Sequence, residues 1–328
     1  MDRRRFLEGA VAAPFVSALP FEVRAQAWPT RNITMVVAFP PGGQADLAAR
    51  PVAAALEKIL GRPVTVDNRS GAGGMLGNAA VARAEPDGHT LLMALSSMVF
   101  LPEAERVMER KPSYEMDQLV PIARVLADPA TLPVMTDAPW KSVADLVEDA
   151  KKRPSTIAFS SSGNYGAGHV PMEMFQQAAG IKLLHVPYRG GGPALAAFLG
   201  NQTPVTVQAP GPVWPHVQDG KVRLLATLAD KRTAEMPNIP TMMELGHKDV
   251  EYYIWAGLFA PKATPAPVIA RLRDAMREVM KSPQVTSGFV KAGSPPAYMD
   301  QPEFVKFVEA DAKRLIPVIR KIGKLDEK

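Results

Sequence analysis

The fold is decided by a stretch near the start of the chain, Ile33-Thr34-Met35-Val36-Val37-Ala38-Phe39-Pro40-Pro41-Gly42-Gly43-Gln44-Ala45-Asp46. The apolar run Ile33–Phe39 predicts a buried strand, and the prolines and glycines after it predict a tight turn. A helix is expected over Gln44–Leu60, because apolar residues recur there at helical spacing. A strand, a glycine turn and a helix in this order are typical of an α/β protein.

The same alternation continues along the chain. Further strands are expected at Pro63–Val66, His89–Leu95, Leu132–Met135, Thr156–Ser160, Leu183–Val186, Val205–Gln208 and Arg223–Leu228, and further helices at Met75–Ala84, Ser142–Lys152, Ala167–Ala179 and Gly192–Leu199. This order predicts parallel sheets covered by helices on both faces. The end of the chain differs, since Ala266–Met280 and Pro302–Ile322 are helical patterns with no strand after them.

Residues 1–27 have the pattern of a cleavable export signal. They contain the basic start Arg3-Arg4-Arg5-Phe6-Leu7, an apolar run from Gly9 to about Pro20, and the small-x-small site Ala25-Gln26-Ala27. Adjacent arginines before Phe-Leu resemble the twin-arginine type of signal, with a general secretory signal as the alternative. An ordinary amphipathic first helix is the competing interpretation. We therefore expect a periplasmic protein, which disfavours functions that need cytosolic nucleotides.

Composition narrows the class further. The chain has no cysteine, which excludes a disulfide framework, a thiolate nucleophile or metal site and a lipid anchor on cysteine. Without residues 1–27 the net charge is about +4, with no concentrated basic patch, so nucleic-acid binding is disfavoured. No later apolar stretch is long enough to span a bilayer. A mature length of roughly 300 residues favours two domains.

Four glycine clusters follow predicted strands and precede predicted helices. They are Pro40-Pro41-Gly42-Gly43, Gly71-Ala72-Gly73-Gly74, Ser160-Ser161-Ser162-Gly163-Asn164 and Arg189-Gly190-Gly191-Gly192. In open α/β sheets this is the edge at which ligands bind, and the free N–H groups of a helix start attract anions. None has the spacing of a nucleotide motif. One such cluster alone is an ordinary turn, but four together favour an anion-binding cleft.

Several segments carry a resemblance to a known family. They are Val36-Val37-Ala38-Phe39-Pro40-Pro41-Gly42-Gly43-Gln44-Ala45-Asp46, Val66-Asp67-Asn68-Arg69-Ser70-Gly71-Ala72-Gly73-Gly74, Pro86-Asp87-Gly88-His89-Thr90-Leu91-Leu92, His185-Val186-Pro187-Tyr188-Arg189-Gly190, Pro240-Thr241 with Glu244-Leu245-Gly246, and Trp255-Ala256-Gly257-Leu258 with Ala260-Pro261. In order and spacing they resemble the Bug-type (tripartite tricarboxylate transporter receptor) family of periplasmic solute-binding proteins.

The resemblance implies a two-lobed periplasmic-binding-protein fold of the type II-like class, with a ligand cleft between the lobes and two crossing hinge strands. Lobe one is expected to comprise residues 28–127 plus 252–328, and lobe two residues 128–251. The ligand is expected to be a small anionic carboxylate, delivered by a monomeric receptor to membrane transporter subunits. No cofactor or metal is expected.

The ligand-loop residues that the resemblance implies are Gly42, Gly43, Asp46, Ser96, Ser162, Gly163, His169, Tyr188 and Gly190. Asp46 has an alternative role, because an acid in the first turn of a helix stabilises the helix dipole. His169 has the alternative of packing within its helix. The sequence departs from the family at Tyr165 and Gly166, where a glycine followed by a serine is common. Tyr165 at the cleft edge suggests a larger or more aromatic ligand, with a solvent-facing side chain as the alternative.

Three rival functions remain. The closed receptor could be read by a sensor kinase instead of a transporter. An exported hydrolase could use Ser160–Ser162 with His169 or His185, but the chain has no G-x-S-x-G elbow. A zinc-dependent receptor is disfavoured because the histidines show no paired ligand spacing.

Overall fold

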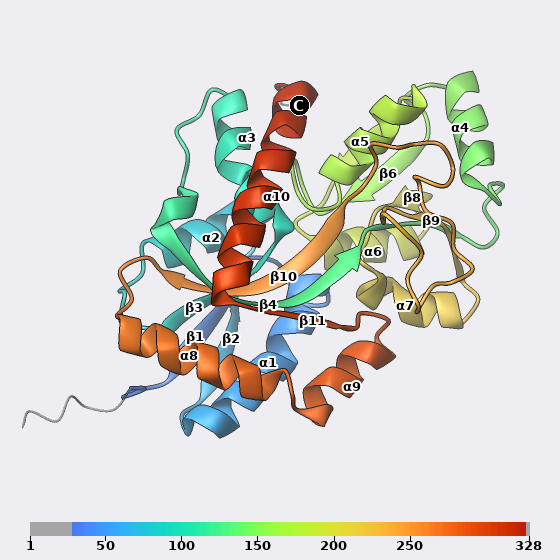
Figure 1. Cartoon of the computed structure of the whole chain (residues 1–328). Helices are drawn as coiled ribbons and strands as arrows, with labels where there is room; N and C mark the ends of the chain where they lie inside the picture. The colour runs from blue at the N-terminus through green and yellow to red at the C-terminus, as the bar shows by residue number, and fades with distance from the viewer. Residues whose placement is uncertain (1–27, 326–328) are drawn as a thin grey trace, which may run out of the picture.

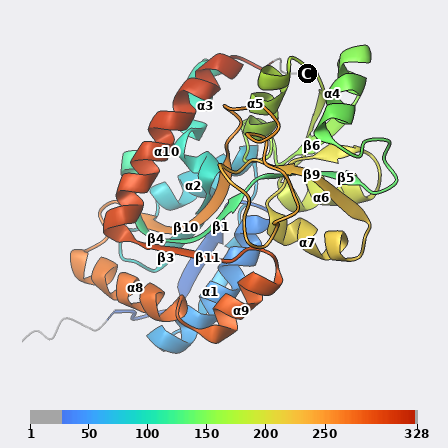
Figure 2. The same cartoon turned by 45° about the vertical axis from the view of Figure 1, so that its right-hand side comes forward.

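Two β-sheets organise residues 28–325, the part of the chain that the computed structural model describes (Figure 1). The first is six-stranded in the order β11-β4-β10-β3-β1-β2, and the second is five-stranded in the order β7-β6-β8-β5-β9. Each sheet and its helices form one lobe, as the turned view in Figure 2 also shows. The chain therefore has the two-lobed α/β fold expected from its sequence.

The first lobe is built from both ends of the chain. Its strands are β1 (Ile33–Val37), β2 (Val64–Asn68), β3 (Thr90–Leu95), β4 (Leu119–Pro129), β10 (Tyr253–Pro261) and β11 (Pro296–Asp300). Its helices are α1 (Gln44–Leu60), α2 (Met75–Ala82), α3 (Leu101–Val107), α8 (Ala266–Val279), α9 (Pro283–Lys291) and α10 (Gln301–Ile322). In both views α2, α3 and α10 lie on one side of the sheet and α1, α8 and α9 on the other.

The second lobe is continuous in sequence. Its strands are β5 (Thr131–Met135), β6 (Ala158–Ser161), β7 (Leu184–Pro187), β8 (Val205–Thr206) and β9 (Val222–Thr227), and its helices are α4 (Val143–Lys152), α5 (Val170–Ala179), α6 (Gly191–Leu199) and α7 (Pro210–Gln218). Short 3-10 turns lie at Ala72–Gly74, Ser96–Val99 and Met116–Gln118. Buried hydrophobic side chains pack on the sheets of both lobes.

Two long strands connect the lobes. β4 runs out of the first sheet and continues after Ala130 as β5 of the second sheet, while β10 returns antiparallel to β4 from Tyr253↔Pro129 to Pro261↔Leu119. At the crossing point the Ala130 N–H donates to the Tyr252 carbonyl (2.9 Å), and the Tyr252 N–H donates to the Leu228 carbonyl (2.8 Å). β4 and β10 are therefore the two crossing strands between the lobes.

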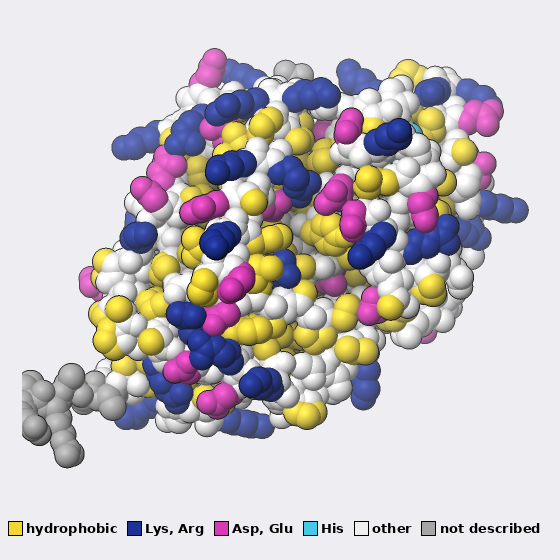
Figure 3. All heavy atoms as spheres, in the orientation of Figure 1, with side chains coloured by type: hydrophobic (Ala, Val, Ile, Leu, Met, Phe, Trp, Pro, Cys, Tyr) yellow, Lys and Arg dark blue, Asp and Glu magenta, His cyan; other side chains and the backbone are white. Residues whose placement is uncertain are grey.

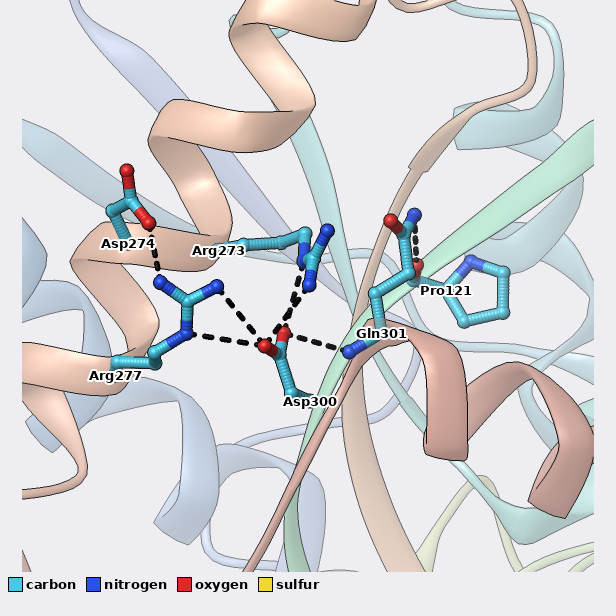
Figure 4. Close-up of polar contacts among 6 residues, drawn as sticks. All are labelled: Pro121, Arg273, Asp274, Arg277, Asp300 and Gln301. Atoms are coloured by element: carbon cyan, nitrogen blue, oxygen red, sulfur yellow. Dashed lines mark hydrogen bonds and ion pairs between the residues drawn. The ribbon is translucent and has the colours of Figure 1, made fainter.

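An ion-pair cluster fixes the C-terminal elements to the first lobe (Figure 4). Asp300 ends β11 and caps α10, where it accepts a hydrogen bond from the Gln301 N–H (2.7 Å). From α8, Arg273 donates twice to the same carboxylate (3.0 Å each). Arg277 donates to it from Nε (3.1 Å) and forms an ion pair with it through Nη2 (3.0 Å). The hydrogen bond from Arg273 is the main reason why the pKa of Asp300 falls to about 2. The Gln301 side chain donates to the Pro121 carbonyl and so joins α10 to β4 (3.1 Å).

Two topological expectations are wrong. The sheets are mixed rather than parallel, because β10 is antiparallel to β3 and β4, and β5 is antiparallel to β8 and β9. The antiparallel strands include those that pass between the lobes, and their pairing depends on distant parts of the chain. A strand also follows the helix Ala266–Val279, since β11 pairs with β4. β11 is half-exposed throughout and begins at a proline, so it lacks the apolar alternation of a typical strand.

The helix expected over Ala167–Ala179 begins only at Val170, because Gly166–Gly168 form a turn held by Ser162 and Gly163. The expected lobe boundaries, 28–127 plus 252–328 and 128–251, stay a prediction. The expected export signal lies outside the described residues. No helix within residues 28–325 combines the length and the apolar character that crossing a membrane requires.

Candidate functional site

Glycine turns from the two lobes meet face to face. A Cβ placed on Gly43 of the first lobe would lie 3.4 Å from the backbone nitrogen of Gly192 in the second lobe. A Cβ on Gly190 would collide with Pro40, only 2.4 Å from its Cδ. The second pair of turns meets in the same way, because a Cβ on Gly73 would lie 3.0 Å from the Asn164 carbonyl oxygen. Only residues without side chains allow the two backbones to approach this closely.

Two helices from opposite lobes begin at this meeting point. α1 begins after Gly43, whose carbonyl accepts from Asp46 and Leu47, and α6 begins after Gly190. Within the described part of the chain, the N–H groups of Gln44, Ala45, Gly191 and Gly192 have no hydrogen-bond acceptor. Free N–H groups and the positive ends of helix dipoles favour a negatively charged ligand. The geometry therefore fits an anion held between the lobes.

A small cavity of ≈ 20 Å³ lies beside these turns. Its walls come from both lobes and from the strand β10, and none of the side chains that line it is charged. The lining residues are Phe39, Gly43, Gln44, Ala45, Leu95, Ser162, Ala167, Gly168, Gly191, Val207, Gln208, Ala209 and Ile254. A cavity of this volume has room for about one water molecule. The structure is therefore a closed arrangement of the two lobes.

Two larger hollows lie away from the glycine turns. One of ≈ 480 Å³ lies on the second lobe beside α4 and α5. The other, of ≈ 530 Å³, lies between α10 and the crossing strands, where Arg124, Tyr253 and Phe307 contribute to its lining. Figure 3 shows a hollow with hydrophobic side chains at its floor in this central position. Neither hollow contains a residue that the sequence predicted for the site.

Five of the predicted residues lie in or next to the converging turns. Gly43 and Ser162 line the cavity, and the Ser162 hydroxyl accepts a hydrogen bond from the Gly168 N–H (3.2 Å). Gly42, Gly163 and Gly190 shape the turns, each with a positive φ, although Gly42 itself is exposed. Gly163 has φ +117°, a backbone conformation that residues with a side chain rarely adopt. Its N–H donates a hydrogen bond to the Ser161 hydroxyl (3.2 Å).

Three predicted residues are engaged elsewhere. The Asp46 carboxylate accepts from Arg50 (2.8 and 2.9 Å), from the Gly42 N–H (3.1 Å) and from Asn68 (3.1 Å). Burial alone would raise the pKa of Asp46, but these hydrogen bonds lower it, so Asp46 braces the first turn from within its own lobe. Ser96 is buried against the hydroxyl of Tyr252 (3.2 Å) at the crossing point, and Tyr188 is half-buried near Gln202.

Tyr165 does not line the cavity. Its hydroxyl donates to the Gly323 carbonyl (2.6 Å) and lies 3.3 Å from the Met108 sulfur, both in the first lobe. Its ring meets the His169 ring edge-on, and its N–H donates to His169 Nδ1 (3.1 Å). The tyrosine thus joins the second-lobe loop to the end of α10. This position gives no support to the interpretation that Tyr165 selects an aromatic ligand.

His169 lies in a buried stack of rings. It is 1% exposed, its ring lies 4.0 Å from that of His185, and Nε2 lies 3.5 Å from the Glu173 carboxylate. Because Nδ1 accepts from the Tyr165 N–H, the neutral ring carries its proton on Nε2. His169 therefore packs and orders the loop, which is the alternative role expected from the sequence.

A serine–histidine pair lies behind the loop. Ser161 Oγ is 2.6 Å from His185 Nε2. Burial, with a smaller effect of His169, lowers the pKa of His185 to about 3, which makes it a weak base at neutral pH. Ser161 also does not line the cavity. Within residues 28–325, no group of three His, Cys, Asp or Glu side chains is placed to hold a metal ion.

Two glutamines that line the cavity, Gln44 and Gln208, were not predicted from the sequence. Gln44 begins α1, and its Nε2 donates to Asp128 Oδ2 (2.5 Å). Gln208 donates to the Gly191 carbonyl (3.1 Å). The only sequence signal was a polar residue directly after each apolar or glycine stretch, which is too common to identify a site.

Comparisons with known proteins show the family of this chain. Residues 48–324 match the model of the tripartite tricarboxylate transporter family receptor. The chain belongs to this receptor family. The protein BugT of Bordetella pertussis is 33% identical over 301 residues, which cover 92% of this chain and 92% of BugT. The family is therefore the one that the sequence predicted.

Two solved structures superpose closely on this chain. The periplasmic binding protein BugD is 30% identical, with a TM-score of 0.84, covering 91% of this chain and 100% of BugD. MatC from Rhodopseudomonas palustris, solved with bound malate, is 27% identical with a TM-score of 0.82, covering 89% of this chain and 100% of MatC. A solved structure similar to this chain thus contains a bound carboxylate.

Proposed function

We propose that this protein captures a small carboxylate between its two lobes and delivers it to the membrane subunits of a tripartite transporter. The observation that carries the proposal is the meeting of the helix starts at Gln44 and Gly191, whose N–H groups are free. Membership of the receptor family and the malate bound to MatC support the same ligand class. Neutral donors hold an anion without a buried arginine, which allows ready release.

The proposal includes a location and a mode of action. We propose that the predicted export signal over residues 1–27 directs the protein to the periplasm. There it would act as a monomer whose two lobes, residues 28–127 plus 252–328 and residues 128–251, open and close. The proposal includes no catalytic role, since the Ser161–His185 pair lies away from the cavity and His185 is a weak base. No observation favours a sensor kinase over a transporter as the receiver of the closed form.

A thermal-shift screen of the purified protein tests the proposal. The panel contains mono-, di- and tricarboxylates together with uncharged sugars of similar size. A ligand at 100 times its Kd stabilises the folded state by about 2.7 kcal/mol, so a carboxylate should raise the Tm and a sugar should not. If only uncharged compounds raise the Tm, the proposal is wrong.

A matched pair of variants locates the binding site. Gly43→Val places methyl groups against the Gly192 backbone and should reduce the carboxylate-induced shift. Gly288→Val makes the same change on the exposed face of α9, with no atom within 4 Å of the new Cβ, and should keep the full shift. Equal shifts in the two variants would place the site elsewhere.

A further inference from the structure

The hollow between α10 and the crossing strands lies on the opposite face of those strands from the cleft. Its volume of ≈ 530 Å³ is within the range of about 300–1,000 Å³ that small-molecule pockets have. Tyr253 of β10 lines this hollow, whereas the next residue, Ile254, lines the cleft cavity. Ala127 of β4 also lines the hollow, whereas Asp128 contacts Gln44 on the cleft side. Successive side chains of a strand point to opposite faces, so the hollow is separate from the site between the glycine turns.

Arg124 on β4 brings an unbalanced positive charge to the hollow. Its side chain is half-buried, its Nε donates to the Ala297 carbonyl (2.9 Å), and its guanidinium carbon lies 4.7 Å from the centre of the Phe307 ring. No acidic side chain within residues 28–325 forms an ion pair with it. Burial lowers the pKa of Arg124, but an arginine in a protein stays charged. Its two Nη groups are available to a carboxylate, which matches their geometry with two parallel hydrogen bonds.

The segment between β9 and β10 brings negative charge to the same hollow. Glu251 is half-buried, and its carboxylate forms no hydrogen bond or ion pair with any described residue. The Asp230 carboxylate accepts a hydrogen bond from the Tyr253 hydroxyl (2.5 Å), and no basic side chain among the described residues pairs with it. A partly buried charge without a partner is unfavourable, so a cationic group at this wall would be stabilising.

The other two charged residues of the hollow balance each other. Asp311 accepts hydrogen bonds from Arg314 (2.8 Å) and from Trp255 Nε1 (2.8 Å). Arg314 also donates to the Glu251 carbonyl oxygen (2.9 Å), which leaves the Glu251 carboxylate unpaired. The charges that remain to be matched are therefore positive at Arg124 and negative on the wall after β9. A ligand that carries one anionic and one cationic group complements both.

We propose that this hollow is a second ligand site, which binds an amino acid with an apolar side chain. The carboxylate of the amino acid pairs with Arg124 and its ammonium group pairs with Glu251. Its side chain packs on the apolar surface that Phe307 and Ala310 contribute. A simple carboxylate would leave the acidic wall unmatched, so the two sites select different ligands. The proposal goes beyond carboxylate capture in the cleft and does not depend on it.

Isothermal titration calorimetry of the purified protein tests the proposal. The probes are leucine, phenylalanine and ε-aminocaproate, which vary the apolar part and the separation between the ammonium group and the carboxylate. At least one probe should bind to wild type. Arg124→Gln and Glu251→Gln each remove one charged partner, so each should weaken this binding about tenfold or more. Glu148→Gln removes an exposed carboxylate from α4 of the second lobe and should behave as wild type.

The fold of the variants is checked by their thermal transitions. Glu251→Gln breaks no side-chain contact within the described residues, so it should keep the wild-type Tm and decides the test even if Arg124→Gln is unstable. The proposal is overturned if no probe binds to wild type. It is also overturned if Glu251→Gln, or a folded Arg124→Gln, binds the probe as tightly as wild type, since the amino acid then lies elsewhere. The thermal-shift screen with carboxylates is a separate measurement, so these outcomes leave the proposed function standing.

Discussion

Asp128 is a buried carboxyl group at the point where the chain leaves the first lobe. It is 2% exposed, pairs across β10 with Ile254, and accepts the hydrogen bond from Gln44. Burial is the main reason why its pKa rises to about 8, with a smaller contribution from Glu235. At neutral pH the folded protein therefore favours the protonated acid, which avoids a buried negative charge beside the cleft.

This pKa predicts a pH dependence of stability. In the unfolded chain Asp128 loses its proton near pH 4, whereas in the folded protein it keeps the proton up to about pH 8. Between these values the folded state binds more protons, so the free energy of unfolding falls as the pH rises. Asp128→Asn keeps an acceptor for Gln44 but does not titrate. Urea unfolding at pH 5 and pH 8 should show a larger fall for wild type than for Asp128→Asn, and equal falls would contradict the assigned pKa.

At the scale of elements, the loop between β6 and α5 connects the cleft to the far end of α10. Tyr165 in this loop donates to Gly323, which follows α10, and lies against Met108 at the end of α3. The loop therefore links the second lobe to the first lobe. Tyr165 has φ +52°, a conformation that is uncommon for a residue with a side chain and that this contact helps to maintain.

Tyr165→Phe tests the role of this contact. Loss of the hydrogen bond to Gly323 should lower the free energy of unfolding by about 1 kcal/mol, measured by urea unfolding. Because the bond joins the two lobes, carboxylate affinity should also weaken although the side chain does not line the cavity. Tyr188→Phe is the control, since that hydroxyl makes only a long, exposed contact with Gln202 (3.4 Å). Identical behaviour of the two variants would contradict the cross-lobe role.

The sequence predicted the local elements well and the long-range ones poorly. The helix Gln44–Leu60 has its predicted bounds, because a glycine turn precedes it and Gly61 ends it in a left-handed conformation. β10 is buried along most of its length, so it shows no alternating pattern that would mark its ends. Its antiparallel pairing follows from the return of the chain between the lobes, which no local pattern encodes.

The candidate site shows the same limit. The glycine turns were predictable because strand, turn and helix are adjacent in sequence. The orientation of the Tyr165 side chain was not predictable, because its hydrogen-bond partner Gly323 is 158 residues away in sequence. Gln44 was missed for a related reason, since its burial depends on Asp128, Ser294 and Gly211 from three other segments.

At the scale of the whole molecule, the described structure is closed. The cavity has room for about one water molecule, so a carboxylate with several carbon atoms enters only when the lobes separate. The crossing strands β4 and β10 are the connection about which the lobes rotate. A ligand that contacts both lobes then favours the closed form over the open one.

Small-angle X-ray scattering of the purified protein, with and without a saturating carboxylate from the thermal-shift screen, tests whether the two lobes close on the ligand. We expect a larger radius of gyration without ligand and a decrease on binding, because the anion draws the two sets of helix starts together. A radius of gyration that does not change, although calorimetry shows saturated binding, would contradict capture of the carboxylate between the lobes.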